Sequence, residues 1–208
     1  RDPATLEESG AFRDYTLREA VSTRQYWIMA VASALPSMII TGIHFHTVQI
    51  YLDHGMQEAD AAGMFATYAI AFSMVTLIGG LLADRLPLNV LLSTSMACLS
   101  GGILLLTQVT DTASSNAFAA VAGGGQGLFS AVSATIWVRY YGRTNLGKIR
   151  GGLTTVGVAA SSAGPFVMGA GHDLFGGFDE VFWVFLAITV PMVGIALLAT
   201  RPARISIP

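Results

Sequence analysis

The chain alternates long apolar stretches with short polar connections. Six stretches carry no charged residue near their middle, and we expect them at residues 26–51, 61–83, 88–109, 116–138, 147–172 and 181–200. An α-helix rises about 1.5 Å per residue, so each stretch is long enough to cross a hydrocarbon core about 30 Å thick. The pattern therefore predicts an all-α membrane protein whose six transmembrane helices form a bundle over residues 25–201.

The eleven basic residues are confined to alternate connections. They lie before the first stretch, after the second, between the fourth and the fifth, and after the sixth, whereas the other three connections carry acidic residues or histidine. Short loops rich in Lys and Arg stay on the cytoplasmic side of a membrane. We therefore expect a multi-pass protein of the cell (inner) membrane with residues 1–24 as a cytoplasmic linker and residues 202–208 as a cytoplasmic tail.

The linker divides into two parts. Residues 1–14 are rich in charge and poor in apolar pattern, which is typical of a flexible segment. Thr16 then precedes Glu19 by three residues, which is the spacing of a capping box. The linker is therefore expected to end in a short helix that lies along the membrane interface.

The composition excludes several classes of function. A content of 53% hydrophobic and 12% charged residues is that of an integral membrane protein. The connections are too short for a soluble domain, so we expect no enzyme, no cofactor, no metal site and no nucleic-acid partner. Short connections also favour antiparallel packing of helices that follow one another in the sequence.

One face of the fourth stretch is polar. It carries residues at the helical spacing i, i+4, i+7 and i+11, namely Gln126, Ser130, Ser133 and Trp137. Polar side chains inside a membrane face either a water-filled cavity or a neighbouring helix. Both readings stay open for this stripe, which is either a cavity wall or a set of helix-to-helix hydrogen bonds.

Polar residues on three other stretches complete the candidate pathway. Thr41 and His44 lie close to one face of the first stretch, and His46 lies on the next face. Tyr68 belongs to the second stretch and Ser161 to the fifth. Imidazole titrates near neutral pH, so His44 or His46 could exchange a proton between two aqueous sides. The third and sixth stretches lack bulky polar groups and are expected to face lipid or to support the others.

The glycine run at residues 123–127 could suggest a phosphate-binding loop. It lies inside an apolar stretch, no strand precedes it, and the expected Lys is missing. Close packing of helices explains it better.

Two connections carry recognisable motifs. The end of the second stretch reads Gly-x-Leu-Ala-Asp-Arg and includes Gly80, Asp84 and Arg85. In motifs of this type, Gly and two basic residues usually follow, whereas this chain has Pro, Leu and Asn at those positions. Arg143 and Arg150 belong to a segment Tyr-x-Gly-Arg followed by Gly-x-x-Arg-Gly between the fourth and fifth stretches. With these motifs the chain resembles the C-terminal six-helix half of a major facilitator superfamily transporter, of the bacterial type similar to monocarboxylate or oxalate/formate carriers.

The resemblance implies a larger assembly. It implies two six-helix halves around a central cavity, each half built from two inverted three-helix repeats, with alternating access by rocking of the halves. The partner, an N-terminal six-helix half, is absent from this chain. The motif residues Gly80, Asp84, Arg85, Arg143 and Arg150 would then form a gate between the halves.

The function predicted from the sequence is secondary active transport of a small organic solute by alternating access. A carboxylate is one candidate solute, and proton coupling is one candidate driving force. No Lys or Arg lies at mid-membrane depth. The positive charge that a carboxylate needs would therefore come from the other half or from a protonated histidine, or else the solute is not an anion.

The sequence also leaves other functions open. An exporter of drugs or metabolites is the alternative within the same class. An intramembrane serine protease is the alternative from another class, because Ser161 and Ser162 precede Ala163 and Gly164. Such a protease would need a histidine within hydrogen-bond reach of its nucleophile.

Overall fold

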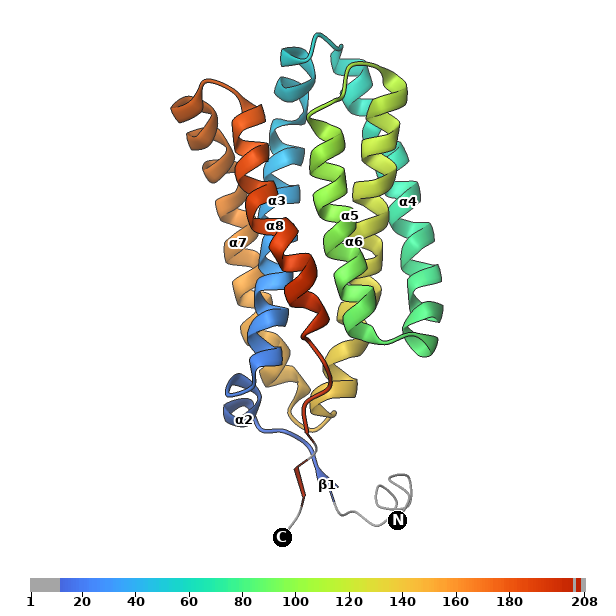
Figure 1. The fold of residues 1–208 in the computed structure, drawn as a ribbon, viewed down its shortest axis with the longest axis vertical. Coiled ribbons are helices and arrows are strands. Elements are labelled where there is room, and N and C mark those ends of the chain that lie inside the picture. The colour runs from blue at the N-terminus through green and yellow to red at the C-terminus, as the bar shows by residue number, and fades with distance from the viewer. Residues whose placement is uncertain (1–11, 204, 207–208) are drawn as a thin grey trace.

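The protein is a bundle of six long helices (Figure 1). The structure is a computed structural model that describes residues 12–203 and 205–206. The long helices are α3 (Arg24–Asp53), α4 (Glu58–Arg85), α5 (Leu88–Leu106), α6 (Thr112–Tyr141), α7 (Leu146–Phe175) and α8 (Phe178–Leu197). Each is long and apolar enough to cross a membrane. The predicted all-α membrane fold with six spanning helices is therefore confirmed.

Smaller elements lie at the two ends of the chain. A short helix, α2 (Leu17–Val21), precedes α3, and a two-residue strand β1 (Phe12–Arg13) pairs antiparallel with β2 (Ile205–Ser206). The predicted capping box is present, because the Thr16 hydroxyl accepts from the Glu19 amide while Glu19 accepts from the Thr16 amide. Most of the predicted flexible linker, residues 1–11, and part of the predicted tail, residues 204 and 207–208, lie outside the described residues.

Most helices extend beyond the apolar stretches that predicted them. For example, α4 begins at Glu58 and α6 at Thr112, each a few residues before its apolar stretch. Polar side chains close these first turns. The Asp111 carboxylate accepts a hydrogen bond of 2.8 Å from the amide of Ser114. Such caps satisfy backbone groups that the helix itself leaves free, so they prolong the helix into the polar connection.

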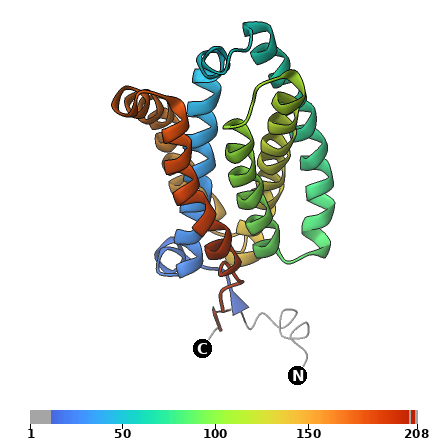
Figure 2. The ribbon, with the colours of Figure 1, turned by 45° about the horizontal axis from the view of Figure 1, so that its top comes forward.

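α3 begins and α8 ends at the same end of the bundle, here called the terminal end, where β1 and β2 also lie (Figures 1 and 2). Except for α5 with α6, however, the main packing partners do not follow one another in the sequence. α3 packs chiefly along α7, α4 along α6, and α5 against α6 and α8. The expectation that sequential helices would be the main neighbours is therefore wrong for α3 with α4, for α4 with α5 and for α6 with α7. Small residues that let distant helices approach closely explain the difference.

The contact between α3 and α7 depends on two glycines. A side-chain Cβ at Gly42 would lie 2.9 Å from the carbonyl oxygen of Gly164. A Cβ at Gly164 would collide with the carbonyl oxygen of Met38. Both neighbours are backbone atoms that cannot rotate away. The two helices therefore touch backbone to backbone at this level.

The contact between α4 and α6 uses the glycine run at residues 123–127. A Cβ at Gly123 would collide with the Tyr68 carbonyl oxygen, and a Cβ at Gly127 would collide with the Phe72 carbonyl oxygen. The Thr76 hydroxyl also donates a hydrogen bond of 3.3 Å to the Gly127 carbonyl. The glycine run serves helix packing, as the sequence predicted.

α4 and α7 bury little of their apolar surface within this chain. Only 6% of the most hydrophobic window of α4 and 17% of that of α7 are buried, whereas the values for α3 and α5 are 56%. Large apolar side chains on their outer faces, such as Leu77 and Phe166, are more than three-quarters exposed. These two helices therefore present an apolar surface to lipid or to another protein segment.

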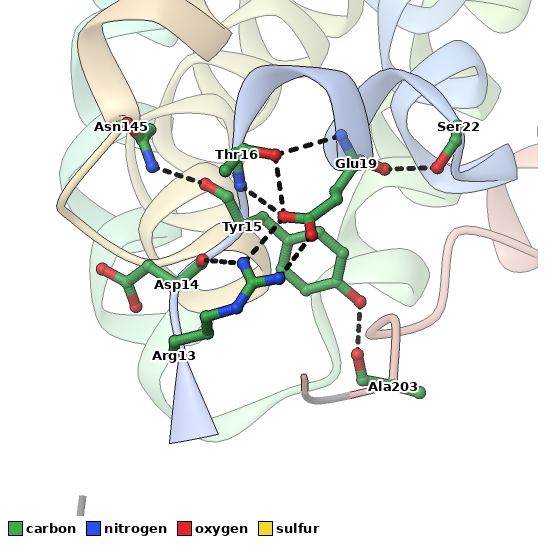
Figure 3. A network of polar contacts seen from close by, with 8 residues as sticks. All are labelled: Arg13, Asp14, Tyr15, Thr16, Glu19, Ser22, Asn145 and Ala203. Carbon is green, nitrogen blue, oxygen red and sulfur yellow. Dashed lines mark hydrogen bonds and ion pairs between the residues drawn. The ribbon is translucent and has the colours of Figure 1, made fainter. Parts of the chain in front are cut away.

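Asp14 and Tyr15 are fastened to the loop between α6 and α7, and Tyr15 also to Ala203 after α8 (Figure 3). We call this arrangement the terminal clasp, formed by residues 13–15, 141–145 and 203. One Asp14 carboxylate oxygen accepts hydrogen bonds of 2.9 Å from the amides of Arg143 and Thr144 and one of 2.7 Å from the Thr144 hydroxyl. These bonds, chiefly that from the Thr144 amide, lower the pKa of Asp14. The carboxylate therefore stays ionised at neutral pH.

Tyr15 completes the terminal clasp. Its amide donates to the Tyr141 carbonyl at 3.1 Å. Figure 3 shows that its carbonyl accepts from the Asn145 side chain, at 2.9 Å, and that its hydroxyl donates to the Ala203 carbonyl. Gly142 has a φ of +86°, and a Cβ there would collide with Asp14. Asp14, the last residue of the segment expected to be flexible, and Tyr15 after it are therefore held by specific contacts to the bundle.

Candidate functional site

Two connected grooves run along the bundle. The first groove lies between α3, α6 and α7, has a volume of about 390 Å³, and is lined largely by hydroxyl-bearing side chains, including Ser33, Ser37, Ser133, Thr154, Ser161 and Ser162. The second groove lies between α4, α6 and α7, has a volume of about 300 Å³, and includes Phe72, Gln126, Phe129 and Ser130. Ser133 and Arg150 line both grooves. The two grooves therefore meet beside these two residues.

The grooves bring together part of the predicted pathway. The predicted residues that line them are Gln126, Ser130, Ser133, Trp137 and Ser161. Thr41, His44, His46 and Tyr68 are not among the lining residues. The lining residues of both grooves come from the four helices that the sequence analysis expected to be wet, and none comes from α5 or α8.

The polar stripe of α6 contributes to both grooves: Gln126 and Ser130 line the second, Trp137 lines the first, and Ser133 lines both. Because residues four and seven positions apart lie on one helical face, Gln126, Ser130 and Ser133 point in the same direction. Trp137 is buried at the end of this stripe, where its ring lies 6.3 Å from that of Tyr26 and is stacked 6.0 Å from that of Tyr141. Trp137 therefore forms an aromatic boundary of the first groove.

Ser161 is tied to α3. Its hydroxyl shares a hydrogen bond of 3.0 Å with the Thr41 hydroxyl, directly beside the Gly42–Gly164 contact. A serine nucleophile would instead need a basic partner such as histidine. The arrangement fits a helix contact at the edge of a groove better than a protease active site.

The two histidines of α3 have different surroundings. His46 Nε2 lies 3.1 Å from the carbonyl oxygen of Pro165 on α7. A carbonyl can only accept, so the proton of neutral His46 is on Nε2. The His44 ring lies edge-on between Phe65 and Tyr68, at 5.1 and 4.7 Å between ring centres, and its Nε2 is buried without a partner among the described residues.

Arg150 is the charged residue of the grooves. It lies in the second turn of α7 and lines both grooves next to Ser133. Among the described residues, none forms an ion pair or hydrogen bond with its guanidinium. The sequence predicted Arg150 to belong to a gating loop. The motif does not show which face of α7 turns toward α6, so it could not show that Arg150 lines the grooves. A fixed positive charge therefore does face the grooves, near one end of them.

The residues of the two sequence motifs lie at the end of α4 and around the loop between α6 and α7. Asp84 Oδ1 accepts from Arg139 Nη2 at 2.6 Å, and the same guanidinium donates to the Ala83 carbonyl at 2.6 Å. This bridge joins the end of α4 to the last turn of α6. Sequence reasoning did not single out Arg139 as a partner, although its position in the last turn of its helix was a usable signal.

The other motif residues make fewer contacts. A Cβ at Gly80 would meet nothing within 4 Å, and Arg85 is exposed without a side-chain partner among the described residues. The backbone of Arg143 belongs to the terminal clasp. Their gating role stays a prediction, because it concerns a contact with a second half.

Six apolar helices around polar grooves define a multi-pass membrane protein of the transporter class. A family model described as Major Facilitator Superfamily matches residues 18–207, and the chain belongs to this family. Its six spanning helices fit one half of such a transporter. Members of the family are transporters rather than enzymes. A comparison with individual curated proteins gives no match.

Proposed function

We propose that the chain is half of a secondary active transporter that moves a small organic solute by alternating access. The second half, an N-terminal six-helix bundle, would cover the exposed apolar faces of α4 and α7. We place the protein in the cell (inner) membrane with the terminal end in the cytoplasm, because its basic residues lie in the connections predicted for that side or in the helix turns next to them.

The observation that carries this proposal is the meeting of the two grooves at Ser133 and Arg150. A hydroxyl-rich wall can hydrogen-bond a solute without binding it so tightly that release is prevented. Arg150 has no partner among the described residues and so favours a solute with a negative charge, such as a carboxylate, which a guanidinium binds with two parallel hydrogen bonds. The apolar α5 and α8 would support this wall from outside.

Cysteines placed along the α6 stripe test whether it lines an aqueous pathway. We expect Gln126→Cys, Ser130→Cys and Ser133→Cys to react with a membrane-impermeant maleimide in the intact transporter, and a transported solute to slow the reaction. The measurement is the rate of labelling after native Cys98 has been replaced by alanine, because Cys98 is a free thiol.

Thr94→Cys is the matched control for labelling. Thr94 is also exposed in this chain, but it lies on α5 and lines neither groove. We expect lipid to cover it and labelling to be slow. If the three α6 cysteines react no faster than Thr94→Cys, the stripe is a dry helix contact and the proposed pathway is wrong.

We further infer that transport is coupled to protons through the α3 histidines. Within the described part of the chain, His44 Nε2 is buried without a partner; such a nitrogen is costly inside a membrane and so points to a functional role. His44→Ala should abolish solute-driven proton movement, measured with a pH-sensitive dye inside proteoliposomes. His172→Ala, at the far end of α7, should leave coupling intact. Normal coupling in His44→Ala would assign the proton to His46 or to another group.

A further inference from the structure

A third cavity lies apart from the two grooves, at the terminal end. It has a volume of about 270 Å³ and is bounded by three arginines from three separate parts of the chain, Arg13, Arg139 and Arg201. We call it the arginine pocket. It shares no lining residue with either groove. A solute in the grooves would therefore not occupy it.

The three arginines differ in how their charges are balanced. Arg13 binds both carboxylate oxygens of Glu19, at 2.6 and 3.0 Å, and this contact is the main reason that the pKa of Glu19 falls to about 2 (Figure 3). Arg139 is paired with Asp84 at 2.6 Å. Among the described residues, Arg201 has no such partner. Among the described residues, it is therefore the arginine of this pocket that pairs with no carboxylate.

One carboxylate also lines the arginine pocket. Asp14 lines it and keeps its negative charge, and one of its oxygens is directed to the loop between α6 and α7, from which it accepts three hydrogen bonds. The remaining walls include the rings of Tyr15 and Tyr140, whose hydroxyls are bound to the backbone of the segment after α8. The segment that carries Arg201 is therefore held in place at the pocket.

The position of the arginine pocket points to the class of ligand. α6 ends at Tyr141 and α8 at Leu197, so the pocket lies where two spanning helices leave the hydrocarbon core. Lipid phosphates lie at this level, and tyrosine side chains are typical of it. Guanidinium groups suit phosphate because they offer several N–H donors in a fixed plane.

We propose that the arginine pocket binds the phosphate of an anionic lipid headgroup through Arg201. Basic pockets at the ends of spanning helices bind such headgroups. Each arginine near the membrane surface contributes about 1 kcal/mol, which changes the affinity for an anionic lipid about fivefold. The site needs only that the helices span a membrane, so it stands independently of the solute pathway.

Lipid competition on the purified intact transporter tests this proposal. Delipidated protein in neutral detergent is mixed with equal amounts of phosphatidylglycerol and phosphatidylcholine, and bound lipid is counted by native mass spectrometry. We expect phosphatidylglycerol to be preferred, and Arg201→Gln to reduce that preference about fivefold. Because Arg201 has no described partner, this change should leave the thermal unfolding midpoint unchanged.

Arg18→Gln is the matched control. Arg18 is an exposed arginine of α2 at the same end of the molecule and does not line the arginine pocket. An equal loss of preference in Arg18→Gln would overturn the proposal in favour of general surface attraction. A third arm adds inorganic phosphate. Displacement of phosphatidylglycerol by phosphate supports recognition of the phosphate group. If phosphate binds but phosphatidylglycerol is not preferred over phosphatidylcholine, the ligand is free phosphate and the lipid proposal is wrong.

Discussion

Gly164→Ala is expected to destabilise the protein strongly, whereas Gly157→Ala on the same helix is expected to have little effect. A Cβ at Gly164 would collide with the Met38 carbonyl and would lie 3.0 Å from the Gly42 amide nitrogen, so α3 and α7 would have to separate. Overpacking in a core costs about 1–3 kcal/mol, and we expect the upper part of this range because the opposing atoms are backbone. The measurement is the thermal unfolding midpoint in detergent.

Gly157 is a close control for this effect. A Cβ at Gly157 would meet only the Ser37 hydroxyl, at 3.8 Å, which is an ordinary contact. Both changes add one methyl group to α7, and both remove the flexibility of a glycine. Equal unfolding midpoints for the two variants would show that the α3–α7 contact can loosen at little cost, contrary to the close approach described above.

Arg150→Gln should reduce uptake of an anionic solute about 10- to 100-fold. A hydrogen bond to a charged group contributes about 1.5–3 kcal/mol, which corresponds to this factor. The neutral amide keeps much of the side-chain length but removes the charge at the place where the two grooves meet. The measurement is uptake of a panel of radiolabelled carboxylates and neutral solutes into proteoliposomes containing the intact transporter.

Two further variants serve as controls for Arg150→Gln. Lys148→Gln removes one positive charge two residues away, at an exposed position that lines neither groove, and should transport normally. Arg150→Lys keeps the charge but not the planar fork, so it should recover part of the uptake. If Arg150→Gln carries anions as fast as Lys148→Gln does, Arg150 does not contact the solute.

The spanning helices could be predicted because their signal is local. A stretch of about 20 apolar residues is enough to identify a membrane helix whatever surrounds it. The stripe of Gln126, Ser130 and Ser133 was predictable for the same reason, since helical spacing alone puts these side chains on one face. The structure adds that this face borders two grooves.

The parts that could not be predicted depend on how helices are placed against one another. Neither the pairing of α3 with α7 nor the entry of Arg150 into the grooves follows from a local pattern. The same holds for the contact between Asp14 and Thr144, which are 130 residues apart. Here a segment expected to be flexible finds its partner on a distant loop.

The pairing of α3 with α7 also bears on how the protein is made. Thr41 and His46 are synthesised 120 and 119 residues before their respective partners, Ser161 and Pro165. At ~5–20 residues per second, the ribosome needs about 6 to 24 seconds to deliver those partners. During that interval α3 carries polar groups that lipid cannot satisfy. The insertion machinery or the intervening helices must therefore shelter α3 until α7 arrives.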